Sequence, residues 1–295
     1  MQQYIARRML LNVLVLLLVA SMVFLALRID SSNVVGQRAQ GCTVGDYEEC
    51  QKVAKQELGL DSPLYKQYFN FMSDIVRLDF GDSWRQKTPV LDEIRSRAAP
   101  SIELGLLQIV VALTVALPIG IISAIRQDSW IDYLLRFFSI ALLGIPVFVL
   151  AILIILVTSR YASGSFLPDW LGPHSATSYA NIWEDPWRNI KIMCGPALIG
   201  GLGTGAVIMR FLRSQMLEVL RQDYVRTAWA KGLKERVIVV RHALKNALIP
   251  VLTVVGILLG SIVSGNVVLE TVYAVPGIGY YVTTAVSQNA TDFPV

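Results

Sequence analysis

The sequence predicts an all-α fold, a polytopic membrane bundle of helices, from its composition, its apolar runs and the distribution of its charges. Of its 295 residues, 54% are hydrophobic and 16% are charged, whereas a typical soluble domain is about 25% charged. Five runs of 18 to 23 residues contain no Asp, Glu, Lys or Arg, and about 20 helical residues cross the core of a bilayer. We therefore expect five transmembrane helices, at Met9–Leu27, Leu104–Ile125, Phe137–Ser159, Ile192–Met209 and Ala247–Leu269.

The first apolar run has two interpretations. Arg7 and Arg8 precede it, as basic residues precede the apolar part of a secretory signal peptide. Its length and its lack of a small-residue cleavage site favour an anchor that stays in the protein. We expect it to form the first span.

Basic residues near the ends of the spans predict the orientation, because Lys and Arg in short loops tend to stay in the cytoplasm. Arg7 and Arg8 precede the first span, and Arg126 and Arg136 bracket a short turn after the second. Residues 210–245 contain nine basic and three acidic residues. These regions share one side if the helices alternate, so the N-terminus is predicted to be cytoplasmic.

The first outer loop, residues 28–99, is predicted to contain an amphipathic helix. Asp61 is a candidate capping residue, and Pro63 would lie in the first helical turn. The apolar residues that follow at helical spacing are Leu64, Tyr68, Phe71, Met72, Ile75 and Val76. We expect this helix to pack on the outer, membrane-proximal face of the bundle rather than to form a binding site of its own.

Two of the three cysteines lie in the same loop. Cys42 and Cys50 are on the side of the membrane where disulfides persist, and we predict that they pair. Cys194 lies at the edge of a span and is predicted to be an ordinary small buried residue.

The sequence provides little for catalysis or ion coupling. It has no G-x-x-x-x-G-K-[ST] phosphate loop, no C-x-x-C pair and only two histidines, His174 and His242, which are predicted to lie on opposite sides of the membrane. No acidic residue or Lys lies deep in an apolar run, where an ion-coupled carrier commonly keeps one. We therefore expect neither an enzyme nor a metal-binding or nucleic-acid-binding protein.

Small residues recur at four-residue spacing in two spans, a spacing that lets helices approach closely. They are Gly201 and Gly205 in the fourth span, and Gly256, Gly260 and Ser264 in the fifth. Ordinary packing of the bundle explains each pair; a role along a transport pathway is the alternative. Prolines that would allow these helices to bend are Pro118, Pro146 and Pro196.

The segment between the fourth and fifth spans predicts a helix, a turn and a second helix. Tyr224–Lys231 contains no helix breaker, Gly232 suits a helix C-terminus, and Lys234–Lys245 begins a helix that continues toward the membrane. A charged loop is usually a solvated surface. This one also carries Tyr224, Val225, Trp229, Leu233, Val237, Ile238 and Leu244, so we expect it to dock a cytoplasmic protein.

Two parts of this loop resemble the cytoplasmic motif of ATP-binding-cassette (ABC) importer permeases, in the dipeptide and oligopeptide variant. The motif is E-A-A, three residues, then Gly, and "RTAWAKG" matches it before "RHALKNALIP". "LGLDSPLYKQY", "GDSW" and "ETVYAVPGIG" are similar to further stretches of the first-permease (B) type of this peptide/nickel family. The matching residues are Arg226, Thr227, Ala228 and Gly232, then His242, Ala243, Leu244, Asn246 and Pro250, and finally Glu270, Pro276, Gly277 and Gly279.

The resemblance implies the type I ABC importer permease fold, with six spans and both ends cytoplasmic. Five spans are visible, so a sixth is expected beyond Val295, with Pro276, Gly277 and Gly279 forming an outer turn before it. The implied function is transport of di- or oligopeptides across the cytoplasmic membrane of a bacterium or archaeon. The three predicted parts are residues 1–27, the cytoplasmic end and first span; residues 28–99, the extracytoplasmic region; and residues 100–295, the permease core with its coupling loop at 218–249.

The resemblance also implies partners: a second, homologous permease, two cytoplasmic ATPases that bind ATP and Mg²⁺, and an extracytoplasmic substrate-binding protein. This chain itself would hold no cofactor. Trp229 and Leu233 would be apolar anchors in an ATPase groove, and Arg226 and Lys231 a polar rim. The residues expected to couple to the ATPases are Tyr224, Arg226, Thr227, Ala228, Trp229, Lys231, Gly232, Leu233, His242, Asn246 and Pro250.

Two alternatives stay open on the sequence. The same machine could import nickel, glutathione or a sugar. The chain could instead be a membrane scaffold that docks a cytoplasmic partner without transporting anything.

Overall fold

The computed structural model describes residues 2–29, 35, 47–57, 60–82, 88–161, 169–172, 174–262 and 266–287. The secondary structure in this part of the chain is helical, apart from one isolated β-bridge between Asp82 and Pro89. The predicted all-α class is therefore confirmed. The chain divides into two compact units, Met1–Ser96 with Thr284–Val295, and Arg97–Thr283.

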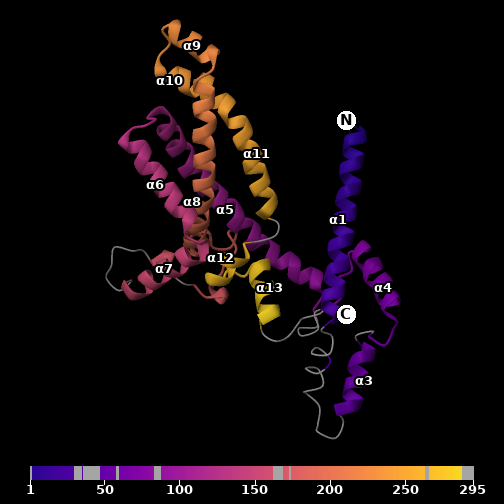
Figure 1. Ribbon diagram of the computed structural model, residues 1–295. Coiled ribbons are helices and arrows are strands. Elements are labelled where there is room, and N and C mark those ends of the chain that lie inside the picture. The colour runs from indigo at the N-terminus through magenta and orange to yellow at the C-terminus, as the bar shows by residue number, and fades with distance from the viewer. Residues whose placement is uncertain are drawn as a thin grey trace. The chain divides into compact units, whose positions relative to one another are not determined.

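The first unit contains α1 (Gln2–Ile29), α3 (Tyr47–Glu57) and α4 (Leu64–Val76). α1 includes the first predicted span and exposes nearly all of its apolar surface. α4 packs on the C-terminal half of α1 (Figure 1), where the ring of Phe24 lies 5.5 Å from that of Tyr68 and 5.4 Å from that of Phe71. A hydrogen bond of 2.8 Å between the hydroxyls of Ser21 and Tyr68 fixes the register of the two helices.

The amphipathic helix was predicted correctly, but its start was not. Pro63, rather than Asp61, precedes its first residue, and no side chain caps it. Pro63 favours a helix start at this point because proline has no backbone N–H to donate, and its φ of −57° already suits a helix. The predicted Cys42–Cys50 disulfide lies outside what the structure describes, since Cys42 and the side chain of Cys50 are not described.

Three continuous apolar helices can cross a membrane in the second unit, judged by length and composition. They are α5 (Val90–Ile125), most of which belongs to this unit, α8 (Pro186–Leu220) and the helical segment Glu235–Gly260. α8 contacts both α6 (Trp130–Gly144) and α11 (Lys245–Ile262) (Figure 1). The predictions for the first, second and fourth spans are confirmed.

The third predicted span, Phe137–Ser159, is not one helix. α6 ends at Gly144, α7 (Val147–Tyr161) follows, and the two are bent by 97°. Pro146 lacks the N–H that a continuing helix needs and drives the preceding residue away from helical dihedrals. Ile145 is accordingly extended, at φ −94° and ψ 120°. The bent pair passes as one span by length and composition, so the predicted third span is a broken one, with the bend next to Pro146.

The fifth span was predicted at Ala247–Leu269, which is longer than the helix that the structure shows there. α11 ends at Ile262, and a separate short helix, α12 (Val267–Val272), begins after Asn266. The Asn266 side chain accepts a hydrogen bond from the Leu269 N–H at 3.3 Å. This N-cap starts a new helix inside what reads as one apolar run.

The small residues of the two spans behave differently. A methyl group at Gly201 would lie 2.6 Å from Cβ of Val111, and one at Gly205 would lie 3.2 Å from the Ala112 carbonyl oxygen, so α5 and α8 are in close contact there. Gly256 and Gly260 have open space where a side chain would be. The close packing expected at Gly256 and Gly260 is thus not found among the described residues, although α11 packs on α8 through other residues. Ser264 lies outside the described part.

A buried ion pair, which the sequence did not reveal, ties three helices together. Asp132 in the first turn of α6 is fully buried, and its carboxylate accepts from Arg213 of α8 at 2.8 Å (Nε) and 2.7 Å (Nη2). Ser123 of α5 donates to the same carboxylate. Two parallel bonds of this kind fix geometry as well as adding energy.

Candidate functional site

The predicted coupling loop folds as a helix, a tight turn and a second helical segment. α9 (Asp223–Ala230) follows α8 directly, and α10 (Glu235–Val237) leads into a π-helix, η3 (Ile238–Leu244), and then into α11. The second helix was expected to be an ordinary α-helix from Lys234. The wider π turns were not predicted, and no sequence signal indicates them; such turns often mark functional sites.

The turn after α9 is a Schellman motif. The Leu233 N–H bonds to the Ala228 carbonyl at 3.4 Å, and the Gly232 N–H bonds to the Trp229 carbonyl at 2.9 Å. Gly232 lies at φ +75°, a left-handed conformation that a residue with a β-carbon resists. The helix-ending role predicted for Gly232 is confirmed.

The inner face of the loop is packed. Val225, Ala228 and Ile238 are buried together, against Val219 and Leu220 at the end of α8. One residue further along η3, Val239 belongs to the main apolar core of the bundle. Both segments of the loop therefore share an apolar core with the helices at its two ends.

A hydrogen-bonded link joins the start of α9 to the start of α11. The Asn246 Nδ2 donates to the Tyr224 hydroxyl at 2.8 Å and to the His242 carbonyl at 3.3 Å. The sequence singled out these three residues separately, and the structure brings them together. Pro250 lies one turn later inside α11, away from this link.

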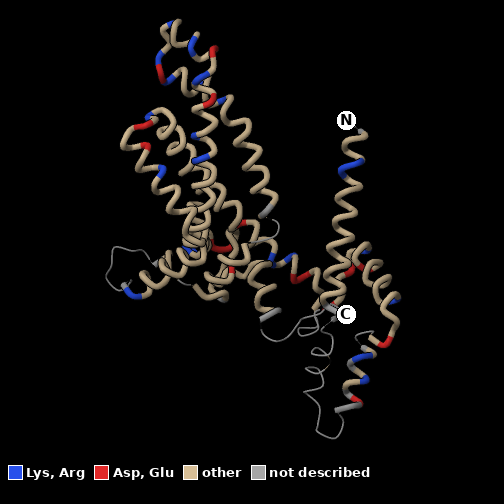
Figure 2. Tube along the Cα trace, viewed as in Figure 1, with Lys and Arg blue, Asp and Glu red and all other residues tan. Residues whose placement is uncertain are grey.

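The face of the coupling loop that points away from the bundle is exposed and partly apolar. Trp229 is 48% exposed and Val240 55%, and Leu233 is exposed as well. Charged residues are interspersed along this loop (Figure 2); Arg226 and Lys231 are among them, and both are exposed. The Arg226–Asp223 ion pair, at 3.5 Å between exposed side chains, adds little stability. The Thr227 hydroxyl donates to the Asp223 carbonyl within α9.

The second predicted feature, the outer turn, is held by a buried carboxylate. Glu270 is fully buried in α12, and it accepts hydrogen bonds from the backbone N–H groups of Asn266 (3.0 Å), Gly279 (2.7 Å) and Tyr280 (3.2 Å). It thus joins the start of α12 to the start of α13 (Ile278–Ser287). Ser101 of α5 accepts from the Ile278 N–H at 2.8 Å.

The glycines of this turn are required for space. A β-carbon at Gly277 would collide with the Glu270 carboxylate and the Ser101 hydroxyl, and one at Gly279 would lie 2.6 Å from Cα of Val267. Pro276 occupies the turn itself, between α12 and α13. At the end of α12, burial raises the pKa of Tyr273 to about 12.

Neither feature has the ligands of a metal site. Among the described residues, no three His, Cys, Asp or Glu side chains lie close enough to hold a metal ion. The two features are an exposed, partly apolar surface on the loop and a turn held by buried hydrogen bonds, and both are connected to apolar helices.

Comparisons with known proteins identify the family. Residues 116–294 match the family described as binding-protein-dependent transport system inner membrane component, and residues 1–104 match the N-terminal part of such membrane components. The dipeptide transport system permease protein of Alkalihalophilus pseudofirmus is 34% identical over 100% of this chain and 90% of its own length. The corresponding protein of Bacillus subtilis is 33% identical over 100% of this chain and 88% of its own length. The glutathione transport system permease protein of Escherichia coli is 32% identical over 100% of this chain and 89% of its own length. The chain is a multi-pass membrane protein that belongs to the family of binding-protein-dependent transport system inner membrane components.

Proposed function

We propose that this chain is the permease subunit of an ABC importer that moves di- or oligopeptides across a cytoplasmic membrane. The observation that carries the proposal is the loop at 218–249, which is locked to two membrane helices on one face and exposes apolar side chains on the other. A rigid element of this kind passes the movement of a docked partner to the helices at its ends. Similarity to dipeptide permeases over the whole chain supports the cargo class.

The partners follow from this reading. Two ATPases would bind ATP and Mg²⁺ in the cytoplasm, a second homologous permease would complete the pathway, and a binding protein would deliver the peptide outside. In the loop, Trp229 and Leu233 would enter a groove of the ATPase, with Arg226 and Lys231 at its rim. The chain would be a non-catalytic subunit, with its N-terminus in the cytoplasm.

Uptake by a reconstituted importer tests the proposal. The chain would be assembled in proteoliposomes with its neighbouring permease, ATPase and binding-protein subunits, and the uptake of labelled dialanine measured with and without ATP. We expect uptake that needs both ATP and the binding protein. Assembly with the ATPases but no uptake of any peptide would indicate a scaffold instead.

A second cargo has a specific observation in its favour. The glutathione permease of Escherichia coli is nearly as similar to this chain as the dipeptide permeases are. Glutathione is itself a peptide, so the same vesicles should be offered labelled glutathione beside dialanine. The cargo with the higher uptake at equal concentration is the better substrate.

A further inference from the structure

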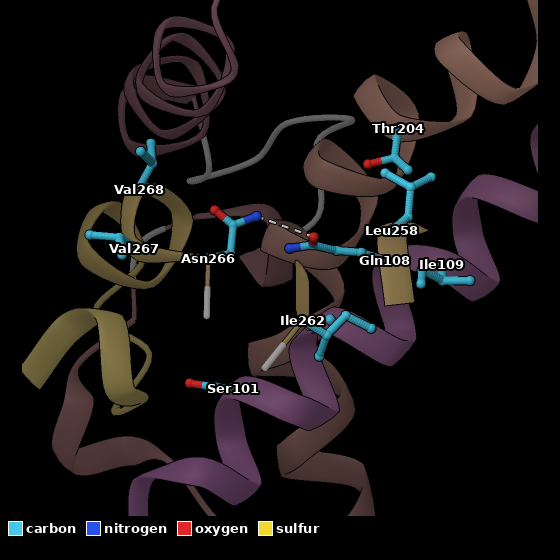
Figure 3. Close-up of a pocket in the computed structure, with 10 residues that line it drawn as sticks. Ser101, Gln108, Ile109, Thr204, Leu258, Ile262, Asn266, Val267 and Val268 are labelled. Atoms are coloured by element: carbon cyan, nitrogen blue, oxygen red, sulfur yellow. Dashed lines mark hydrogen bonds between the residues drawn. The ribbon is translucent and has the colours of Figure 1, made fainter. Parts of the chain in front are cut away.

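A cavity of about 320 Å³ lies among α5, α8, α11 and the start of α12 (Figure 3). This volume is at the lower end of small-molecule sites. Its lining combines apolar side chains, such as those of Ile109 and Leu258, with the polar side chains of Ser101, Gln108, Thr204 and Asn266. All of these residues belong to the second unit.

Gln108 belongs to the lining of this cavity and has a buried donor that no hydrogen bond uses. The residue is only 7% exposed, and its Nε2 has no hydrogen-bond partner. Space for the amide comes from Gly200, where a β-carbon would lie 2.6 Å from Cδ of Gln108. A buried donor without a partner costs free energy, so a ligand that accepts from it would recover that cost.

The orientation of the Gln108 amide is set by its neighbour. Asn266 uses its Oδ1 to cap α12, which turns its Nδ2 toward Gln108, and Nδ2 donates to the Gln108 Oε1 at 3.2 Å (Figure 3). A flipped Gln108 amide would place two donors against each other. The Nε2 is therefore the atom left free.

The remaining polar groups are also uncharged donors. The Ser101 hydroxyl accepts from the Ile278 N–H, which leaves its own hydrogen for another acceptor. Thr204 adds a second hydroxyl. None of the described residues that line the cavity has a charged side chain, so it suits a neutral oxygen acceptor beside a small apolar group.

We propose that this cavity is a substrate subsite of the permease that binds the carbonyl oxygen of a peptide bond, with a small apolar side chain packed beside it. The Gln108 Nε2 is the main donor, and Thr204 is a secondary one. The inference rests on the proposed function, because it deepens that function by assigning a place where the peptide pauses in this subunit.

Thiol protection tests occupancy of the cavity. Leu258→Cys places a reporter in the lining, and Val254→Cys, one turn away on α11, places a matched control in a second cavity of about 310 Å³. Maleimide labelling of each position would be followed by site-resolved mass spectrometry in importer proteoliposomes, with and without dialanine. Labelling at position 258 should slow by about tenfold once dialanine exceeds its dissociation constant tenfold, with no change at position 254. Equal labelling rates at position 258 with and without dialanine would overturn the proposal. A cavity filled by lipid carbonyls would give these equal rates too, and would equally rule out a peptide subsite.

Two comparisons test recognition of the carbonyl. Gln108→Leu, of similar volume, should raise the half-protecting dialanine concentration by about tenfold, and Thr204→Val should raise it less. A dialanine analogue whose peptide carbonyl is reduced to CH₂ should protect unmodified Gln108 about tenfold more weakly and be insensitive to Gln108→Leu. An unchanged labelling rate at position 254 shows that each variant is folded. Equal protection by the analogue and dialanine would refute carbonyl recognition.

Failure here is distinguishable from failure of the proposed function. Wild-type vesicles that accumulate dialanine with ATP, yet show no protection at position 258, would remove only the subsite. Vesicles that accumulate no peptide would remove the importer function itself.

Discussion

Two helix ends in the second unit are closed by the same motif in opposite surroundings. α9 ends with Gly232 at φ +75° on an exposed loop, whereas α12 ends with Ala274 at φ 51° next to the buried Glu270. Both show the paired bonds of a Schellman turn; in α12 they run from the Val275 N–H to the Glu270 carbonyl (2.9 Å) and from the Ala274 N–H to the Thr271 carbonyl (3.3 Å).

The difference lies in what else holds each turn. At α12, the surrounding hydrogen bonds and packing over-determine the backbone, so an alanine is tolerated in a left-handed conformation. At α9 no described residue lies within 4 Å of where a Gly232 side chain would be, and the turn depends on its own local bonds. The turn after α12 is held by its buried surroundings, whereas the turn after α9 leaves an exposed surface to which a partner could bind.

The largest effect is expected away from both turns, at the buried ion pair that ties α5, α6 and α8 together. Arg213→Met would leave the buried Asp132 carboxylate without its cation, which costs about 3–5 kcal/mol when a buried pair is broken on one side. The midpoint of thermal unfolding in detergent should fall steeply. The double variant Asp132→Leu with Arg213→Met should be clearly more stable than the single one; equal stability would show that the charge is not the cause.

A smaller loss is expected at the outer turn. Glu270→Ala would remove the carboxylate that accepts from three backbone N–H groups, one in a buried and two in part-buried hydrogen bonds, a loss of roughly 3 kcal/mol. Glu270→Gln keeps one acceptor oxygen and should lose about half of that. Measurement of unfolding midpoints for both variants decides the matter: if Glu270→Ala matches the wild type, the carboxylate does not hold the turn.

The fold is predictable from the sequence as far as local chemistry determines it. Apolar runs located α1, α5 and α8, and a glycine located the end of α9, because length and left-handed geometry are properties of a short segment. Whether Pro146 merely bends a helix or ends it depends on neighbours that the sequence does not show.

The partners of polar side chains were the part that sequence reasoning missed. Gln108 and Asn266 are 158 residues apart and Asp132 and Arg213 are 81 apart, so only the packed structure brings them together. A lone amide such as that of Gln108 within an apolar run was the one available signal, since a polar residue in a span usually needs a partner. Gly256 shows the converse, because its spacing suggested a close contact that is not found among the residues the structure describes.

At the exposed turn, function should fail before stability does. Gly232→Val forces a β-branched residue into a left-handed conformation, at a local cost of about 1–2 kcal/mol, and tilts α9 relative to η3. Membrane insertion should remain normal, because the apolar runs are unchanged. Co-purification of the ATPases or ATP-dependent uptake should be lost.

The matched control is Trp229→Ala, which keeps the turn and removes an exposed apolar side chain. It should weaken ATPase binding with little effect on the unfolding midpoint. Full assembly and unimpaired uptake in Gly232→Val would show that the loop is only a solvated connector.

The smallest expected effect, and the most direct comparison of the two turns, comes from exchanging their left-handed residues. Ala274→Gly relieves a conformation that costs alanine about 1 kcal/mol, but glycine loses more freedom on folding, so the net gain should be only about 0.5 kcal/mol. Gly232→Ala should cost about 1 kcal/mol, because the open space around it neither resists nor supports the new methyl group. Unfolding midpoints of both variants should therefore shift in opposite directions. A loss of stability in Ala274→Gly would mean that the alanine methyl group, and not only the surrounding hydrogen bonds, helps to hold the buried turn.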